Sequence, residues 1–120
     1  MMEGCPMNTD NQTAWVSSDQ DLREMLSAKD HVIALFHASW CPFCLRFLPI
    51  FQKQAEKQGR RFVIVQDDQE TIADPYSVTV YPTVLFFEKG AVSKRLDGVV
   101  GVGLDETQLA RFVQSCSWPE

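Results

Sequence analysis

Two cysteines separated by two residues are the part of this sequence best suited to chemistry. Cys41 and Cys44 stand in the segment Trp40-Cys41-Pro42-Phe43-Cys44. A thiol pair at this spacing can close into a disulfide with little movement, so one thiol can attack a disulfide in another molecule. The second thiol can then displace that molecule in reduced form. The spacing therefore indicates thiol–disulfide exchange, with Cys41 as the attacking thiol and Cys44 as the resolving thiol.

The neighbouring sequence places this pair where a strand passes into a helix. The apolar run at residues 32–37 has the length and composition of a buried strand. Apolar residues then recur at helical spacing over about residues 42–58, with Pro49 inside that segment. Cys41 is therefore expected at a helix start, where unpaired N–H groups and the helix dipole stabilise an anion. A thiolate is such an anion, and it is the reactive form of cysteine.

Length and composition limit the alternatives. The chain has 120 residues, of which 45% are hydrophobic and 22% charged, and its net charge is −5. These values predict a single globular domain at residues 13–120, preceded by a flexible arm at residues 1–12. The acidic balance argues against a nucleic-acid partner, and no segment has the length and apolarity of a membrane span. Four cysteines are too few for a disulfide scaffold, and the start lacks an apolar signal segment, so we expect a cytoplasmic protein.

The elements expected along the chain alternate between strands and helices. Strands are expected at about residues 14–16, 32–37, 62–65, 83–87 and 91–96. Helices are expected at about residues 18–29, 42–58 and 70–75, and after a capping-box pattern formed by Asp105 and Gln108. This order predicts an α/β fold with a central mixed sheet of about five strands, flanked by about four helices.

Together these features resemble the thioredoxin family. The match covers roughly residues 14–116, and these elements carry it: the apolar strand, the segment from Trp40 to Cys44, Pro49, Tyr81-Pro82-Thr83 and Gly98. The resemblance implies a thioredoxin fold and a protein disulfide oxidoreductase that uses no bound cofactor. It also implies that the Tyr81–Pro82 peptide bond is cis and lies against the dithiol.

The resemblance further implies which residues meet the substrate and which partners the chain has. The docking surface would consist of Trp40, Pro42, Phe43, Tyr81, Pro82, Thr83 and Gly98. An extended substrate segment would pair with the backbone of Tyr81 by strand addition. Disulfide-containing proteins would be the substrates, a thiol reductant or a reductase would restore the dithiol, and we expect a monomer.

Two buried positions depart from the family pattern. Thioredoxins carry an aspartate in the second strand and a lysine in the third, where this sequence has Leu35 and Val63. In the family, the aspartate helps to move the proton of the resolving cysteine, so proton transfer from Cys44 needs another base here. His37 is the candidate, because it shares a strand face with Leu35. We predict that Asp67, at the end of the neighbouring strand, hydrogen-bonds His37 and raises its pKa, so that His37 carries protons. The alternative is a histidine that packs where the family has an aromatic residue and has no catalytic part.

Metal binding is a competing interpretation of the same residue types. A C-x-x-C pair can be half of a zinc site, but the other cysteines and histidines show no paired spacing. Asp67, Asp68 and Glu70 contain carboxylates that suit a metal ion, although a solvated loop is the favoured interpretation. We therefore expect no metal site in this chain.

A binding function is the second open class. A thioredoxin fold can dock a partner protein and keep its dithiol as a regulatory or vestigial element, since fold does not fix function. The apolar Leu35 and Val63 favour this alternative. Two further cysteines, Cys5 and Cys116, stand apart from the motif and are interpreted as free thiols.

Overall fold

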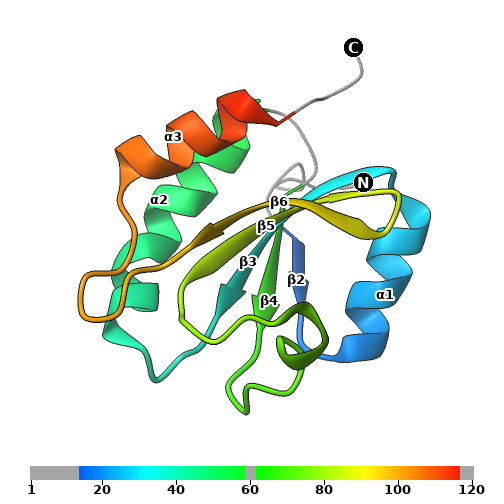
Figure 1. The fold of residues 1–120 in the computed structure, drawn as a ribbon, viewed down its shortest axis with the longest axis horizontal. Helices are drawn as coiled ribbons and strands as arrows, with labels where there is room; N and C mark the ends of the chain where they lie inside the picture. The colour runs from blue at the N-terminus through cyan, green and yellow to red at the C-terminus, as the bar shows by residue number, and fades with distance from the viewer. Residues whose placement is uncertain (1–13, 59–61, 117–120) are drawn as a thin grey trace, which may run out of the picture.

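The computed structural model describes residues 14–58 and 62–116 (Figure 1). The predicted N-terminal arm, including Cys5, lies outside the described residues. The elements follow in the order β2 (Ala14–Val16), α1 (Asp19–Ala28), β3 (His31–His37), α2 (Pro42–Gln58), β4 (Phe62–Gln66), the 3-10 turn η1 (Asp74–Tyr76), β5 (Thr83–Glu88), β6 (Ala91–Asp97) and α3 (Glu106–Ser115). Within this described part, no helix is both long and apolar enough to cross a membrane.

In the part of the chain that the structure describes, five strands form one mixed sheet in the order β2-β4-β3-β5-β6. The strands β2, β4 and β3 run parallel, and β5 pairs antiparallel with both β3 and β6. Figure 1 shows α2 and α3 together on one side of the sheet and α1 on the other. The central strand β3 is an uninterrupted apolar run up to His37 because helices cover both of its faces. The predicted mixed sheet and thioredoxin fold are confirmed.

The alternating side chains of β3 divide the interior into two cores. Val32, Ala34 and Phe36 pack on the α1 side, in a core that also holds Cys41 and Cys44. Ile33 and Leu35 pack on the other side, against apolar side chains of α2 and α3 that include Phe47, Phe51 and Leu109. The position where thioredoxins carry an acid is therefore filled here by a fully buried apolar side chain.

The helices begin where the sequence predicts, with one exception. The Ser18 side chain caps α1 by accepting the Asp21 N–H, and Asp105 and Gln108 form the predicted capping box of α3. The segment expected to be helical at 70–75 contains only the 3-10 turn Asp74–Tyr76. Three consecutive backbone N–H groups before this turn, at 71–73, donate to the Asp67 carboxylate instead. Residues 14–58 and 62–116 consequently form three α-helices, where the sequence predicts about four.

Candidate active site

The dithiol lies at the junction between β3 and α2. A hydrogen bond of 3.2 Å from the Cys41 N–H to the Ala38 carbonyl turns the chain, and the Leu45 N–H donates to the Cys41 carbonyl to begin the helix. The Cys44 N–H donates to the Cys41 sulfur at 3.4 Å. Because this amide belongs to the first turn of α2, the Cys41 sulfur receives the partial positive charge of a helix N-terminus. This is the placement that the sequence predicts for the attacking thiol.

Both thiols are free, and both are covered. Cys41 is 5% exposed and Cys44 is fully buried. Cys41 is thus the outer of the two thiols, and it too is almost fully covered. Its thiol donates a hydrogen bond of 3.6 Å to the Tyr81 carbonyl, which lies over it.

Cys44 is held as a neutral thiol. Burial raises the pKa of Cys44 from 9.0 to about 12, and the neighbouring Cys41 sulfur adds to this rise, while a backbone hydrogen bond with Ala38 lowers it in part. Neutral thiol is a poor nucleophile, so Cys44 must lose its proton before it attacks a mixed disulfide. The apolar Leu35 provides no acid or base for that step.

The cis-proline loop forms the opposite wall of the site. The Tyr81–Pro82 peptide bond is cis, as predicted. The Thr83 hydroxyl donates to the Val80 carbonyl at 2.6 Å and accepts the Gly98 N–H at 3.4 Å. A Cβ atom at Gly98 would collide with the Pro82 carbonyl oxygen, so only glycine fits at this approach of β6 to the loop. Thr83 and Gly98 therefore support the loop from behind.

Trp40 forms the exposed rim beside Cys41. The Trp40 side chain is 53% exposed, and its indole Nε1–H donates to the Asp68 carbonyl at 2.8 Å. Its ring lies 5.9 Å from the ring of Tyr81, centroid to centroid. Phe43 is partly buried beside the motif, with the Arg46 guanidinium 5.2 Å from its ring centre. The structure thus places the aromatic residues of the predicted docking surface around the dithiol.

The predicted hydrogen bond between Asp67 and His37 is wrong. The Asp67 carboxylate accepts the N–H groups of residues 71–73 and the Tyr81 hydroxyl, and it has no bond to the imidazole. Only the backbones of the two residues meet, where the Asp67 N–H donates to the His37 carbonyl at 2.8 Å. Asp67 is also buried, so it does not belong to the solvated acidic loop that the sequence favoured.

His37 is buried, and its Nδ1 has no hydrogen-bond partner among the described residues. Its ring packs edge-on against Trp15, 5.8 Å between centroids. Burial lowers the pKa of His37, and the charge of Asp68 offsets this only in part. The imidazole is therefore neutral at neutral pH, and its part in proton transfer stays a prediction.

An apolar hairpin beside the motif was not identified from the sequence. In the connection from β6 to α3, Val99 and Gly103 exchange two backbone hydrogen bonds, of 3.3 and 2.8 Å, and so form a hairpin at residues 99–103. At its tip Val100 is 80% exposed and Val102 is 64% exposed. Gly103 lies close against Phe43: a Cβ atom added at Gly103 would come within 3.1 Å of the Phe43 Cβ. The run of valines and glycines at 98–103 is the sequence signal that could have revealed this surface.

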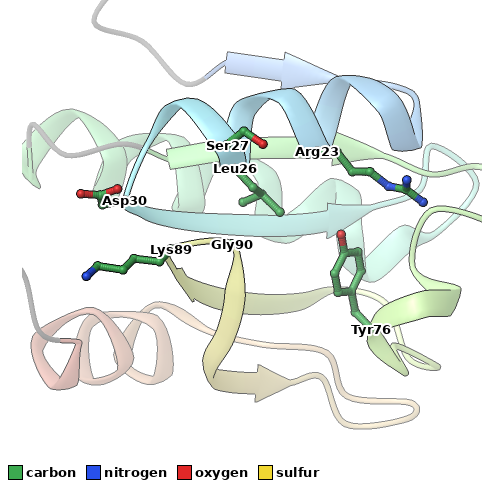
Figure 2. A pocket seen from close by; sticks show the side chains of 7 residues that line it. All are labelled: Arg23, Leu26, Ser27, Asp30, Tyr76, Lys89 and Gly90. Carbon is green, nitrogen blue, oxygen red and sulfur yellow. The ribbon is translucent and has the colours of Figure 1, made fainter.

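A metal site and a surface cavity are the other kinds of feature that could bind a ligand. Among the residues that the structure describes, no group of three or more His, Cys, Asp or Glu side chains is placed to hold a metal ion. A cavity of about 590 Å³ lies between α1, the residue before β3 and the β5–β6 turn. Figure 2 shows the side chains that line it, with the Tyr76 ring on one side. None of the predicted site residues lines this cavity.

The sequence matches the family model for thioredoxin over residues 13–115. The chain belongs to the thioredoxin family. It is 41% identical over 85 residues to the thioredoxin of Mycoplasma genitalium, a match that covers 69% of this chain and 83% of that protein. It is 35% identical over 81 residues to bovine protein disulfide-isomerase A5, a match that covers 62% of this chain but only 16% of that longer protein.

Solved thioredoxin structures share the fold. A mutant thioredoxin from Halobacterium salinarum superposes with a TM-score of 0.73 at 25% identity, covering 88% of this chain and 90% of that one. Thioredoxin from Plasmodium falciparum gives a TM-score of 0.74 at 19% identity and is covered completely by the match, which includes 88% of this chain. Within this thioredoxin fold, Leu35 and Val63 remain the departures that bear on the chemistry.

Proposed function

We propose that this thioredoxin-family protein is a thiol–disulfide oxidoreductase that reduces disulfide bonds in proteins. One observation carries the proposal: the Cys41 sulfur accepts an amide hydrogen bond at the start of α2 and faces the cis Tyr81–Pro82 loop, with the Cys44 thiol one helical turn behind. The relatives support the same class, since they include thioredoxins and a protein disulfide-isomerase.

The proposed reaction has two exchange steps. The Cys41 thiolate attacks one sulfur of the substrate disulfide, the substrate S–S bond breaks, and the other substrate sulfur leaves as a thiolate that takes up a proton. Cys44 then loses its proton and attacks the Cys41 sulfur, which forms the Cys41–Cys44 disulfide and releases the second substrate thiolate. Two electrons pass from the dithiol to the substrate, and a small thiol or a reductase protein returns them.

The surface around Cys41 supports a polypeptide substrate. Tyr81 lies two residues before β5, and its backbone can pair with an extended chain laid over the dithiol. Trp40 and the hairpin at residues 99–103, which lies against Phe43, add exposed apolar area near the motif. Such area is uncommon on a protein surface unless it has a binding role, so we infer that unfolded or extended segments with apolar side chains bind best.

Turnover with insulin and dithiothreitol tests this proposal. The wild-type chain is expected to accelerate insulin reduction, and Cys41→Ser is expected to abolish the acceleration. Cys116→Ser is the matched control, because this buried cysteine lies at the end of α3, outside the motif. An insulin rate that is the same for wild type and Cys41→Ser would refute the proposal.

A binding module is the second candidate. The burial of Cys41 and the raised pKa of Cys44 favour it, since both slow exchange. Trapping separates the two functions: Cys44→Ser is expected to accumulate mixed disulfides through Cys41 if the chain turns over. A docking module would bind its partner equally well after Cys41→Ser.

A further inference from the structure

Two consecutive aspartates at the end of β4 hold the two walls of the dithiol site. Asp67 is buried and Asp68 is exposed, as expected where successive side chains of an extended segment point in opposite directions. Each carboxylate accepts hydrogen bonds from a segment distant in sequence. The bonds of Asp67 lead to the cis-proline loop, and those of Asp68 lead to the residues just before Cys41.

Asp67 fixes Tyr81. Its Oδ2 accepts the Tyr81 hydroxyl at 2.8 Å, while the three N–H groups at 71–73 hold the carboxylate itself in place at 2.8 to 3.0 Å. Burial and the Asp67 carboxylate raise the pKa of Tyr81, so the phenol stays protonated and remains a donor. The far end of the same residue, its backbone carbonyl, accepts the Cys41 thiol. By holding the Tyr81 ring, Asp67 therefore also holds in place the Tyr81 backbone carbonyl that lies over Cys41.

Asp68 fixes the segment on the other side of the sulfur. Its two carboxylate oxygens accept the Ser39 N–H at 2.7 Å and the Ser39 hydroxyl at 2.6 Å. Its backbone carbonyl accepts the Trp40 indole N–H at 2.8 Å. The Trp40 and Tyr81 rings, each held by one of the two aspartates, then meet at 5.9 Å.

We propose that Asp67 and Asp68 form a clamp that keeps Trp40 and Tyr81 closed over Cys41 and so controls which molecules reach the thiol. Small reagents are slowed because the closed clamp leaves Cys41 almost covered. A polypeptide substrate gains from the same clamp, because the Tyr81 backbone and the Trp40 ring are already in place to receive it. Asp67, Asp68 and Tyr81 are positioning residues in this proposal, which rests on the proposed function for its statement about substrates.

Alkylation of reduced protein by iodoacetamide, mapped to single cysteines by mass spectrometry, tests the clamp without any turnover. Tyr81→Phe removes the bond to Asp67 and leaves that carboxylate with three amide donors; Asp68→Asn weakens the hold on Ser39. Each variant is expected to raise the alkylation rate of Cys41 about tenfold, the change that corresponds to about 1.4 kcal/mol. In Tyr81→Phe, which changes no charge at neutral pH, the pH dependence of the rate keeps its shape, because only access changes.

Tyr76→Phe is the matched control, since it removes a hydroxyl on the wall of the Figure 2 cavity, away from the clamp. Its Cys41 rate is expected to equal that of wild type. An unchanged Cys41 rate in both Tyr81→Phe and Asp68→Asn overturns the clamp. A joint rise at Cys41 and the buried Cys116 also overturns it, because this pattern shows general unfolding.

The insulin assay adds the substrate half of the test. Tyr81→Phe and Asp68→Asn are expected to raise KM for insulin severalfold with little change in kcat, whereas Tyr76→Phe changes neither. Variants with a wild-type KM overturn the part of the proposal that concerns polypeptides. If wild type itself fails to reduce insulin while the variants still raise the alkylation rate of Cys41, the proposed function is wrong and the clamp is supported.

Discussion

The resolving step should depend on pH in a way set by the burial of Cys44. The pKa of this thiol is raised from 9.0 to about 12, and burial, the largest cause, persists when Cys41 is in a mixed disulfide. This rise corresponds to a cost of about 4 kcal/mol for forming the thiolate. In the reduced protein, about one Cys44 in a hundred thousand is then ionised at pH 7, and about one in a hundred at pH 10.

A chromogenic mixed disulfide measures this step alone. Cys41 is first loaded with thionitrobenzoate under conditions that leave Cys44 reduced, and release of the coloured thiol is followed after a jump to each pH. The release rate is expected to rise about tenfold per pH unit from pH 6 to pH 10, because only the thiolate attacks. Cys44→Ser is the control and should release no thionitrobenzoate without added thiol.

A rate that levels off by pH 8 would refute this reasoning, because it would require an internal base or a far more acidic Cys44. His37→Phe then identifies the base. If His37 carried the proton, the wild-type profile would level off above the lowered pKa of His37, and the variant would lose that plateau. If His37 only packs in the core, wild type and variant share one slope.

Three further results are expected. Gly98→Ala should lower the free energy of unfolding by about 2 kcal/mol in urea denaturation, because its Cβ meets the rigid Pro82 carbonyl; an unchanged midpoint would contradict the close approach. Val100→Ser with Val102→Ser should lower kcat/KM for insulin about fivefold and leave the reduction of a small aromatic disulfide unchanged, since only a polypeptide reaches the hairpin; equal losses with both substrates would remove the hairpin from docking. Burial lowers the pKa of His37 in the folded chain, so as the pH falls below 6.5 His37 is protonated more in the unfolded chain than in the folded one, and the free energy of unfolding falls. His37→Phe should lose part of this acid sensitivity in denaturation curves at pH 5 and pH 7.

Local patterns were sufficient to predict the five strands and three α-helices of the described residues. The apolar run that became β3, the helical spacing after Cys41 and the capping box at Asp105 each depend on neighbours within a few residues. The same is true of the dithiol, whose two thiols share one helical turn. The cis peptide before Pro82 came from the family resemblance rather than from local physics.

Contacts between distant segments could not be read from the sequence. The ends of adjacent strands predict a bond between Asp67 and His37, but the Asp67 carboxylate accepts three loop N–H groups and the Tyr81 hydroxyl instead. Those same bonds replace the helix expected at 70–75. The hydrogen bonds of Asp68 with Ser39 and Trp40 likewise join residues 29 and 28 positions apart, and no local pattern predicts them.

A redox titration of the Cys41–Cys44 pair tests the central claim most directly. The protein is equilibrated in buffers of graded thiol and disulfide content, alkylated, and mapped by mass spectrometry to find which cysteines have become bonded. The structure predicts one two-electron transition that joins Cys41 to Cys44, and its absence in Cys41→Ser and Cys44→Ser. A chain whose Cys41 and Cys44 stay reduced at every potential, or bond only to other thiols, would contradict the account.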